Sequence, residues 1–215
     1  MKKIFLLPLL AIFFSTTAAA SEPPVEIHAA KSLEWSRKAK TYTARDHVVV
    51  TQGTVRMETD VLTAHYNDSN GATDISVLEA GPHVTISSPP YTALGDKAVY
   101  DVKAGMGTMT GRDLKIIMDK NLMTAQDKIE FFNHENRLTA SGKATVTRDG
   151  DMLTADKLSA YFIKDASGKM IVGKITAEGH VALKTAKETA TGDSGVYDVP
   201  SQKAALTGKV NISQG

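Results

Sequence analysis

Apolar and polar residues alternate along most of the chain beyond its first twenty positions. Examples are the run Val48 to Val50, the pair Val55 and Met57, and the pair Ile129 and Phe131. A period of two residues is typical of a β-strand with one face turned to a core, and no later stretch keeps a helical period over three turns. The pattern therefore predicts an almost wholly antiparallel β-protein.

Turn-forming residues set the expected number of strands. Gly, Asp and Asn separate the apolar stretches at intervals of about 8–12 residues, which is a common spacing in all-β domains. Over the length of the chain this spacing predicts about sixteen short strands. Strands of this number and length are typical of a sandwich, a jelly roll or a β-solenoid.

An internal repeat covers the chain. A shift of 96 positions places Asp60 on Asp156, and one inserted residue later a shift of 97 places His83 on His180. Self-similarity at this distance indicates a duplicated module. Because no Pro-rich or Ser-rich linker separates the copies, we expect a single domain over residues 21–215. The two copies fall at about 25–120 and 121–215.

Residues 1–20 have the pattern of an export signal. A positive start at Lys2 and Lys3 precedes an apolar run from Ile4 to Phe14, and small residues follow up to Ala20. This order predicts cleavage before Ser21. The apolar run is shorter than the ~20 residues that a membrane-spanning helix needs. We therefore expect an exported chain whose signal is removed, located in the periplasm.

Composition and charge exclude several classes of protein. The chain has 25 Lys and Arg against 24 Asp and Glu, so it lacks the basic excess of a nucleic-acid-binding protein. It has no Cys, which excludes thiolate metal sites, disulfides and cysteine nucleophiles. We expect no nucleic-acid partner.

The sequence gives little support for a catalytic site. The six histidines do not have the spacing of convergent metal ligands. Ser194, in the segment Gly192 to Gly195, has the setting of a nucleophile, but the equivalent position of the first copy is Lys97. A Ser-His-Asp triad also needs a positioned His and Asp, for which the sequence offers no support. The sequence predicts no enzyme activity, no catalytic residue, no metal and no cofactor.

The aliphatic residues on the expected strands are the informative set. They form either the core of an ordinary sandwich or the lining of a trough between two separated sheets. Such a trough is suited to acyl chains, because each methylene that it buries contributes ~0.8 kcal/mol to the free energy of binding. The candidate lining residues are Val48, Val50, Val55, Met57, Leu62, Val84, Ile86, Ile129, Phe131, Val146, Leu153, Leu158, Val181 and Leu183.

Three segments of the sequence carry a family resemblance. They are Val48 to Asp60, with its Val-Thr-Gln-Gly-Thr phrase, Ala140 to Val146, and Thr154 to Leu158. The chain resembles the LptA/OstA-like family of periplasmic lipopolysaccharide transport proteins over residues 25–212. The resemblance implies an open antiparallel β-jelly-roll of two facing sheets that holds lipid A acyl chains for outer-membrane assembly.

The resemblance also implies partners. It predicts that the protein binds lipopolysaccharide and bridges the two membranes, between an LptC-like inner-membrane protein and an LptD-like outer-membrane translocon. Val25 and Ile27 match the first strand of the family, whose aliphatic pair faces both lipid and partner. The last apolar segment, with Leu206, Val210 and Ile212, has little charge, so we expect it to pair head-to-tail with another copy.

Two other interpretations remain open. The chain is alternatively a membrane-anchored, LptC-like scaffold of the same fold, which retention of residues 1–20 would indicate. It is otherwise a structural exported β-repeat protein, which the absence of co-purifying lipid would indicate.

Overall fold

The computed structural model describes residues 24–69 and 72–214. Within these ranges it contains eighteen β-strands and no helix. The strand pairings described are all antiparallel, so the predicted all-β antiparallel fold is confirmed, with eighteen strands in place of about sixteen. In the same part of the chain, no helical segment meets the length and hydropathy required to span a membrane. The expected signal, residues 1–20, lies outside the described residues.

The chain divides into two compact units, with unit 1 ending at Met109 and unit 2 starting at Thr110. The strands that begin in unit 1 are β1 (Glu26–His28), β2 (Ser32–Ser36), β3 (Thr41–Gln52), β4 (Val55–Ser69), β5 (Ala72–Ala80), β6 (Val84–Ser88), β7 (Tyr91–Gly95), β8 (Lys97–Asp101) and β9 (Met106–Thr110). Those of unit 2 are β10 (Leu114–Met118), β11 (Asn121–Ala125), β12 (Lys128–Phe132), β13 (Arg137–Arg148), β14 (Asp151–Lys164), β15 (Met170–Lys184), β16 (Glu188–Asp198), β17 (Lys203–Thr207) and β18 (Asn211–Gln214).

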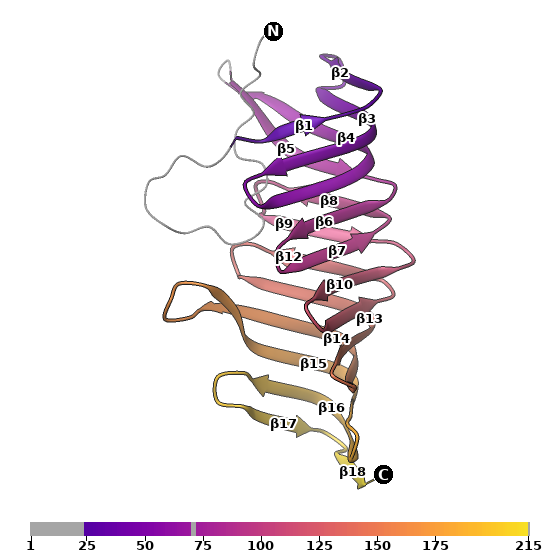
Figure 1. The fold of residues 1–215 in the computed structure, drawn as a ribbon, viewed down its shortest axis with the longest axis vertical. Coiled ribbons are helices and arrows are strands. Elements are labelled where there is room, and N and C mark those ends of the chain that lie inside the picture. Colours follow the sequence, from indigo (N-terminus) through magenta and orange to yellow (C-terminus); the bar gives the residue numbers. More distant parts are fainter. Residues whose placement is uncertain (1–23, 70–71, 215) are drawn as a thin grey trace. The chain divides into compact units, whose positions relative to one another are not determined.

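Each unit is a sheet folded into two walls, because its longest strands bend and belong to both. In unit 2 the strands β13, β14, β15 and β16 run side by side (Figure 1). One half of each of these four strands belongs to the first wall, together with β10, β11 and β18. The other half of each belongs to the second wall, together with β12 and β17.

Unit 1 repeats this arrangement. The first wall contains β1, β6 and β7, and the second wall contains β2, β5 and β8. The strands β3 and β4 pass from one wall to the other. The two walls face each other, because Val25 at the start of the first wall packs against Ala64 and Leu78 of the second.

Two residues with positive φ turn a strand at the corner between the walls. In β15 these are Gly179 (φ 73°) and His180 (φ 46°), and the pairing register shifts at the same place. Such a bulge bends a strand, and its first position favours glycine because φ is positive. A Cβ on Gly179 would overlap the carboxylate of Asp156 on the neighbouring strand. The corner therefore requires glycine for two reasons, the backbone angle and the close neighbour.

The last apolar segment differs from the expectation of one strand. Gly208 (φ 71°) and Lys209 (φ 46°) form a further corner, which splits the segment into β17 and β18. Leu206 therefore lies on the second wall, Ile212 lies on the first, and Val210 lies in the connection.

Candidate functional site

The aliphatic residues predicted to line a trough are all buried or half-buried. In unit 1 the pairing register brings four of them into one row across the first wall, where Ile27 pairs with Val50, Val50 with Met57 and Met57 with Ile86. Directly paired residues point to the same face of a sheet. The row is therefore a continuous apolar stripe on the inward face of that wall.

The other predicted residues of unit 1 flank this row. Val25 and Val55 also point inward and lie two residues beyond the row, on the side away from the corner. Val48 and Val84 lie two residues from the row on the corner side and are almost fully buried. Leu62 lies on the second wall, paired with an alanine on each side. The structure thus brings the predicted residues of unit 1 onto two facing surfaces.

A longer row crosses the first wall of unit 2. The register joins residues of seven strands in turn, and the predicted Val146, Leu153 and Leu183 stand in its middle. The complete row is Ile116, Met123, Val146, Leu153, Leu183, Ala190 and Ile212. All seven side chains are apolar, so this wall presents one hydrocarbon surface from β10 to β18.

The second wall of unit 2 is lined by both small and large side chains. Its row nearest the corner consists of Ile129, Ala140, Leu158, Ala177, Gly195 and Leu206. The next row begins at Phe131. Val181, which was also predicted, faces this wall from the first: a Cβ built on Gly195 would lie 3.6 Å from its side chain. Small residues at the corner bring the two walls close together there.

Sequence reasoning missed four apolar residues that belong to these surfaces. Ile116 and Met123 extend the long row of unit 2, and Met123 could have been found because it repeats Ile27 at the shift of 96. Leu33 and Trp35 stand on the inward face of β2, where both are more than half exposed. Their exposure marks β2 as a second strand edge beside β1.

The predicted edge residues have different environments. Val25, Ile27 and Leu206 are half-buried, whereas Val210 and Ile212 are exposed. Ile212 is 61% exposed although it completes an apolar row, because β18 pairs with β16 on one side and no further described strand pairs with its other side. An exposed apolar residue on such an edge strand is suited to the addition of a further strand.

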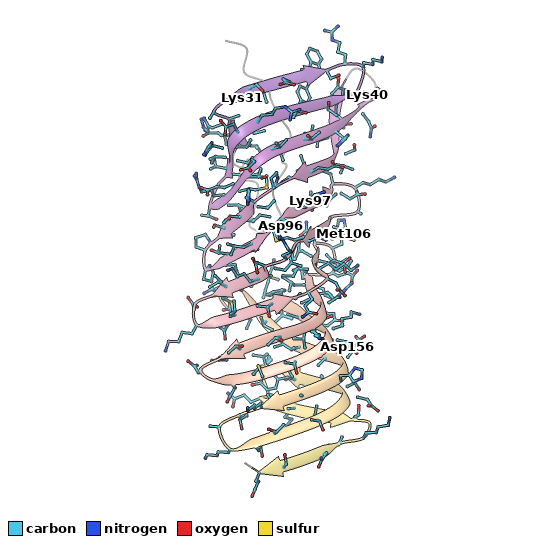
Figure 2. The ribbon with its side chains drawn as sticks, turned by 90° about the vertical axis from the view of Figure 1, so that its right-hand side faces the viewer. Lys31, Lys40, Asp96, Lys97, Met106 and Asp156 are labelled. Carbon is cyan, nitrogen blue, oxygen red and sulfur yellow. The ribbon has the colours of Figure 1, made fainter. Side chains whose placement is uncertain are left out.

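Polar contacts gather at the corners between the walls. His180 Nδ1 lies 2.8 Å from Oδ2 of Asp156, which Figure 2 labels, and His83 makes the same contact with Asp60 at 2.9 Å. These side chains are exposed on the outside of the corner. Among the described residues, no group of three or more His, Cys, Asp and Glu side chains is gathered to hold a metal ion.

One groove in unit 2 lies on the outward face of the first wall. It has a volume of about 820 Å³, and its floor is formed by Lys115, Thr124, Thr145 and Thr154. Basic and acidic side chains both border it, including Lys143. Leu114, Ala125 and Ala155 also line this groove, so its lining is both polar and apolar.

Two acidic side chains at hairpin turns have shifted pKa values. The hydroxyl of Ser201 donates to Asp198 Oδ1 and lowers the pKa of that carboxyl group, and the backbone N–H of Ser201 lowers it further. Asp165 has a pKa lowered mainly by the Ser167 hydroxyl and then by the backbone N–H of Lys169. Both groups order turns and lie outside the apolar rows.

The chain is similar to known proteins along nearly all of its described length. A family model described as "LptA/(LptD N-terminal domain) LPS transport protein" matches residues 26–131 and again residues 123–215. An uncharacterized protein of Rhizobium meliloti (strain 1021) is 25% identical over 107 residues, which cover 47% of this chain and 58% of that relative.

A solved structure is also similar. It is that of LptH from Pseudomonas aeruginosa, described as the LptA homologous periplasmic component of the conserved lipopolysaccharide transport device. The identity is 18%, with 70% of this chain and 82% of that chain covered and a TM-score of 0.27.

Proposed function

Because the chain belongs to the LptA/LptD N-terminal domain family of lipopolysaccharide transport proteins, we propose that it is a periplasmic lipopolysaccharide-binding transport protein. In this proposal it carries lipid A acyl chains between its walls and bridges the inner and outer membranes. The observation that carries the proposal is the row of seven apolar residues across the first wall of unit 2.

The physical basis is the burial of hydrocarbon. Each acyl methylene that leaves water contributes ~0.8 kcal/mol. The row offers similar side chains on every strand, from Met123 through Val146 and Leu153 to Leu183. Because neighbouring positions are nearly equivalent, an acyl chain can move from one to the next. It does not have to escape from one especially strong binding site. This is the property required of a transport protein, and it needs no catalytic group.

The strand edges supply the proposed partner sites. β1 and β2 lie at the start of unit 1, and β17 and β18 lie at the end of unit 2. A partner strand that adds to such an edge gains backbone hydrogen bonds and extends the apolar row. We assign these edges to an LptC-like protein, to an LptD-like translocon and to other copies of this chain. Head-to-tail pairing of this kind does not close, so assembly is open-ended.

The proposed organisation is one exported domain made of two copies. The same shift of 96 relates the pair Ile27 and Val50 to the pair Met123 and Val146, which supports the duplication at the level of strand register. The family model also matches twice. Removal of residues 1–20 would distinguish a periplasmic carrier from an anchored scaffold of the same fold.

Lipid retained by the protein tests the proposal. The full chain is expressed in a Gram-negative host, purified from the periplasm without detergent and measured by native mass spectrometry. We expect a mature N-terminus near Ser21 and a population with bound lipopolysaccharide. A protein that carries no lipid and takes up none from added lipopolysaccharide would instead support a purely structural role.

A further inference from the structure

The hairpin of β14 and β15 extends past the strands on either side of it. The last residue of β14 that pairs with β13 is Tyr161, and the first residue of β15 that pairs with β16 is Lys174. Among the described strands, residues 162–164 and 170–172 pair only with each other (Figure 1, in orange). The hairpin therefore projects from the rim of the second wall, which is the end of its strands away from the corner.

Hydrogen bonds hold both the base and the tip of this hairpin. At the base, the backbone N–H of Phe162 donates to Asn136 over 2.8 Å, and that of Val199 donates to Gly173 over 2.9 Å. At the tip, the carboxylate of Asp165 accepts hydrogen bonds from two backbone N–H groups of the turn and from one hydroxyl. The projecting end is thus fixed to its neighbours and has a defined turn.

The inward face of the hairpin changes from apolar to cationic toward the rim. Side chains of a strand alternate between its faces, so the inward positions of β14 that follow Leu158 end with Phe162 and Lys164. Their direct partners on β15 are Val172 and Met170, which point the same way. The three apolar side chains at the end of this face are half-buried, whereas Lys164 is exposed.

This order of side chains matches the order of groups in an amphipathic anionic lipid. Acyl chains between the walls lie against the apolar residues, and a hydrated headgroup lies at the rim. A phosphate group on that headgroup comes level with Lys164 and with Lys169, which is also exposed. The ammonium group of lysine has three N–H donors and forms charge-assisted hydrogen bonds with phosphate.

The charge of the hairpin also favours an anionic ligand. Residues 161–174 contain three Lys and one Asp, whereas the matched residues 65–77 of unit 1 contain two Asp and neither Lys nor Arg. The shift of 96 places Lys164 on Asp68. Both hairpins have a register shift at the matched place, so the same strand pairing accommodates either charge. The lysines of unit 2 are therefore not required by the fold.

We propose that the β14–β15 hairpin binds a phosphate group of the carried lipid through Lys164 and Lys169. The inference rests on the proposed function and adds the position of the anionic headgroup to that of the acyl chains. Exposed ion pairs contribute little free energy, so the contact orients the headgroup and does not trap the lipid. A lipid in unit 1 is carried by the apolar surfaces there and lacks only this contact.

Charge reversal tests the two lysines. The variants are Lys164→Asp, which introduces the residue of the matched position in unit 1, and Lys169→Asp. The control is Lys143→Asp, which changes the net charge equally at an exposed corner residue. Isothermal titration calorimetry measures the binding of purified lipopolysaccharide, of the same lipid after chemical removal of its phosphates, and of inorganic phosphate alone.

We expect each hairpin variant to bind the intact lipid roughly two- to fivefold more weakly than the control, the range for one exposed ion pair. The phosphate-free lipid should bind equally to all variants, and inorganic phosphate alone should not bind measurably.

Three results would overturn the inference while leaving lipid binding intact. They are equal affinity of hairpin and control variants for the intact lipid, an equal loss for the phosphate-free lipid, and binding of inorganic phosphate that requires the two lysines. The last result would indicate a site for free phosphate. An unaltered chain that binds neither form of the lipid would reject the proposed function itself, and the inference with it.

A spin label locates the phosphate group independently of affinity, because the chain contains no Cys of its own. A label on Ala166→Cys, at an exposed residue of the hairpin turn, should broaden the phosphorus NMR resonances of bound lipopolysaccharide. A label on Lys143→Cys, at the corner, should leave them nearly unchanged. Equal broadening by both labels, broadening by the corner label alone, or broadening by neither would contradict the inference.

Discussion

The imidazole of His180 and the carboxylate of Asp156 lie on neighbouring strands, with Nδ1 2.8 Å from Oδ2. A carboxylate can only accept a hydrogen bond, so Nδ1 carries the hydrogen. His83 and Asp60 repeat the contact at 2.9 Å in the other unit. The structure thus gives the two equivalent histidines the same partner, at the corner between the walls and away from the apolar rows.

Loss of these histidines should have little effect on stability or lipid binding. Exposed ion pairs contribute about 0–1 kcal/mol, and both His83 and His180 are largely exposed. We expect His83→Gln with His180→Gln to change the free energy of unfolding in urea by no more than this amount and to bind lipopolysaccharide normally. A folded double variant that no longer binds lipid would show that the histidines have a direct functional role.

A side chain at the corner glycine should destabilise unit 2. In Gly179→Ala the new Cβ meets the Asp156 carboxylate and also occupies a backbone with φ 73°. The matched control is Gly168→Ala, where φ is 82° and no atom lies within 4 Å of the new Cβ. Strain alone should cost the control about 1–2 kcal/mol. A clearly larger loss for Gly179→Ala in urea denaturation is expected, and equal losses would mean that the Asp156 contact is unimportant.

A charge on the inward row should weaken lipid binding. Leu153→Asp places a carboxylate against the acyl chains, and burial of a polar group without a partner costs roughly 2–7 kcal/mol. Met152→Asp is the control, because Met152 is the adjacent residue on the outward face of β14. Titration with lipopolysaccharide should show a large loss of affinity for the first variant only. Equal affinities would place the lipid elsewhere.

A charge on the exposed end of the row should weaken self-association. Ile212→Lys alters the inward rung of β18, whereas Ser213→Lys alters the next residue, which points to the other face. Sedimentation velocity over a range of concentrations should show concentration-dependent growth for the unaltered chain and for Ser213→Lys. Ile212→Lys should remain small. An unaltered chain that is monomeric at all concentrations, and pairs with no LptC-like partner, would reject head-to-tail assembly.

The turn between β16 and β17 should become less ordered in acid. The pKa of Asp198 is lowered below its usual value of 3.8, chiefly by the Ser201 hydroxyl. The turn is therefore stabilised above the pKa of the unfolded chain, and this stabilisation is lost as the pH falls through the lowered pKa of the folded chain. Carboxyl NMR titration should find the Asp198 pKa below 3.8, and Ser201→Ala should raise it. An unchanged value in this variant would exclude the hydroxyl as the main cause.

The period of the apolar residues was sufficient to predict the fold class but not the ends of the strands. Alternation identified the strand segments around Val50 and Ile129 because a strand exposes opposite faces in turn. It did not show that a strand bends and changes walls. In β14 the alternation changes phase at the corner, because the inward residues Leu153 and Leu158 are five positions apart, but a change of phase alone does not indicate a second wall. The split of the last segment at Gly208 had a sequence signal in the pair Gly208 and Lys209, which parallels Gly179 and His180.

The sequence predicted part of the apolar surface, whose role in lipid binding stays a prediction. The sequence identified Val146, Leu153 and Leu183 as inward residues, and the register aligns them in one row. It did not reveal that Val50 and Met57, the equivalents of Val146 and Leu153, are more deeply buried. Burial of this kind depends on the packing of residues that are distant in the sequence, which composition and period do not encode.

The row that ends at Ile212 also restricts which strand can be added to β18. Side chains alternate between the two faces, so a shift of one residue would move every apolar group of the added strand to the outside. The incoming segment must therefore match the parity of β18, with an apolar residue opposite Ile212 and others at every second position from it. This requirement selects strands by the alternation of their apolar residues and not by partner-specific side-chain contacts. Any strand with apolar residues at the matching alternate positions can therefore be added.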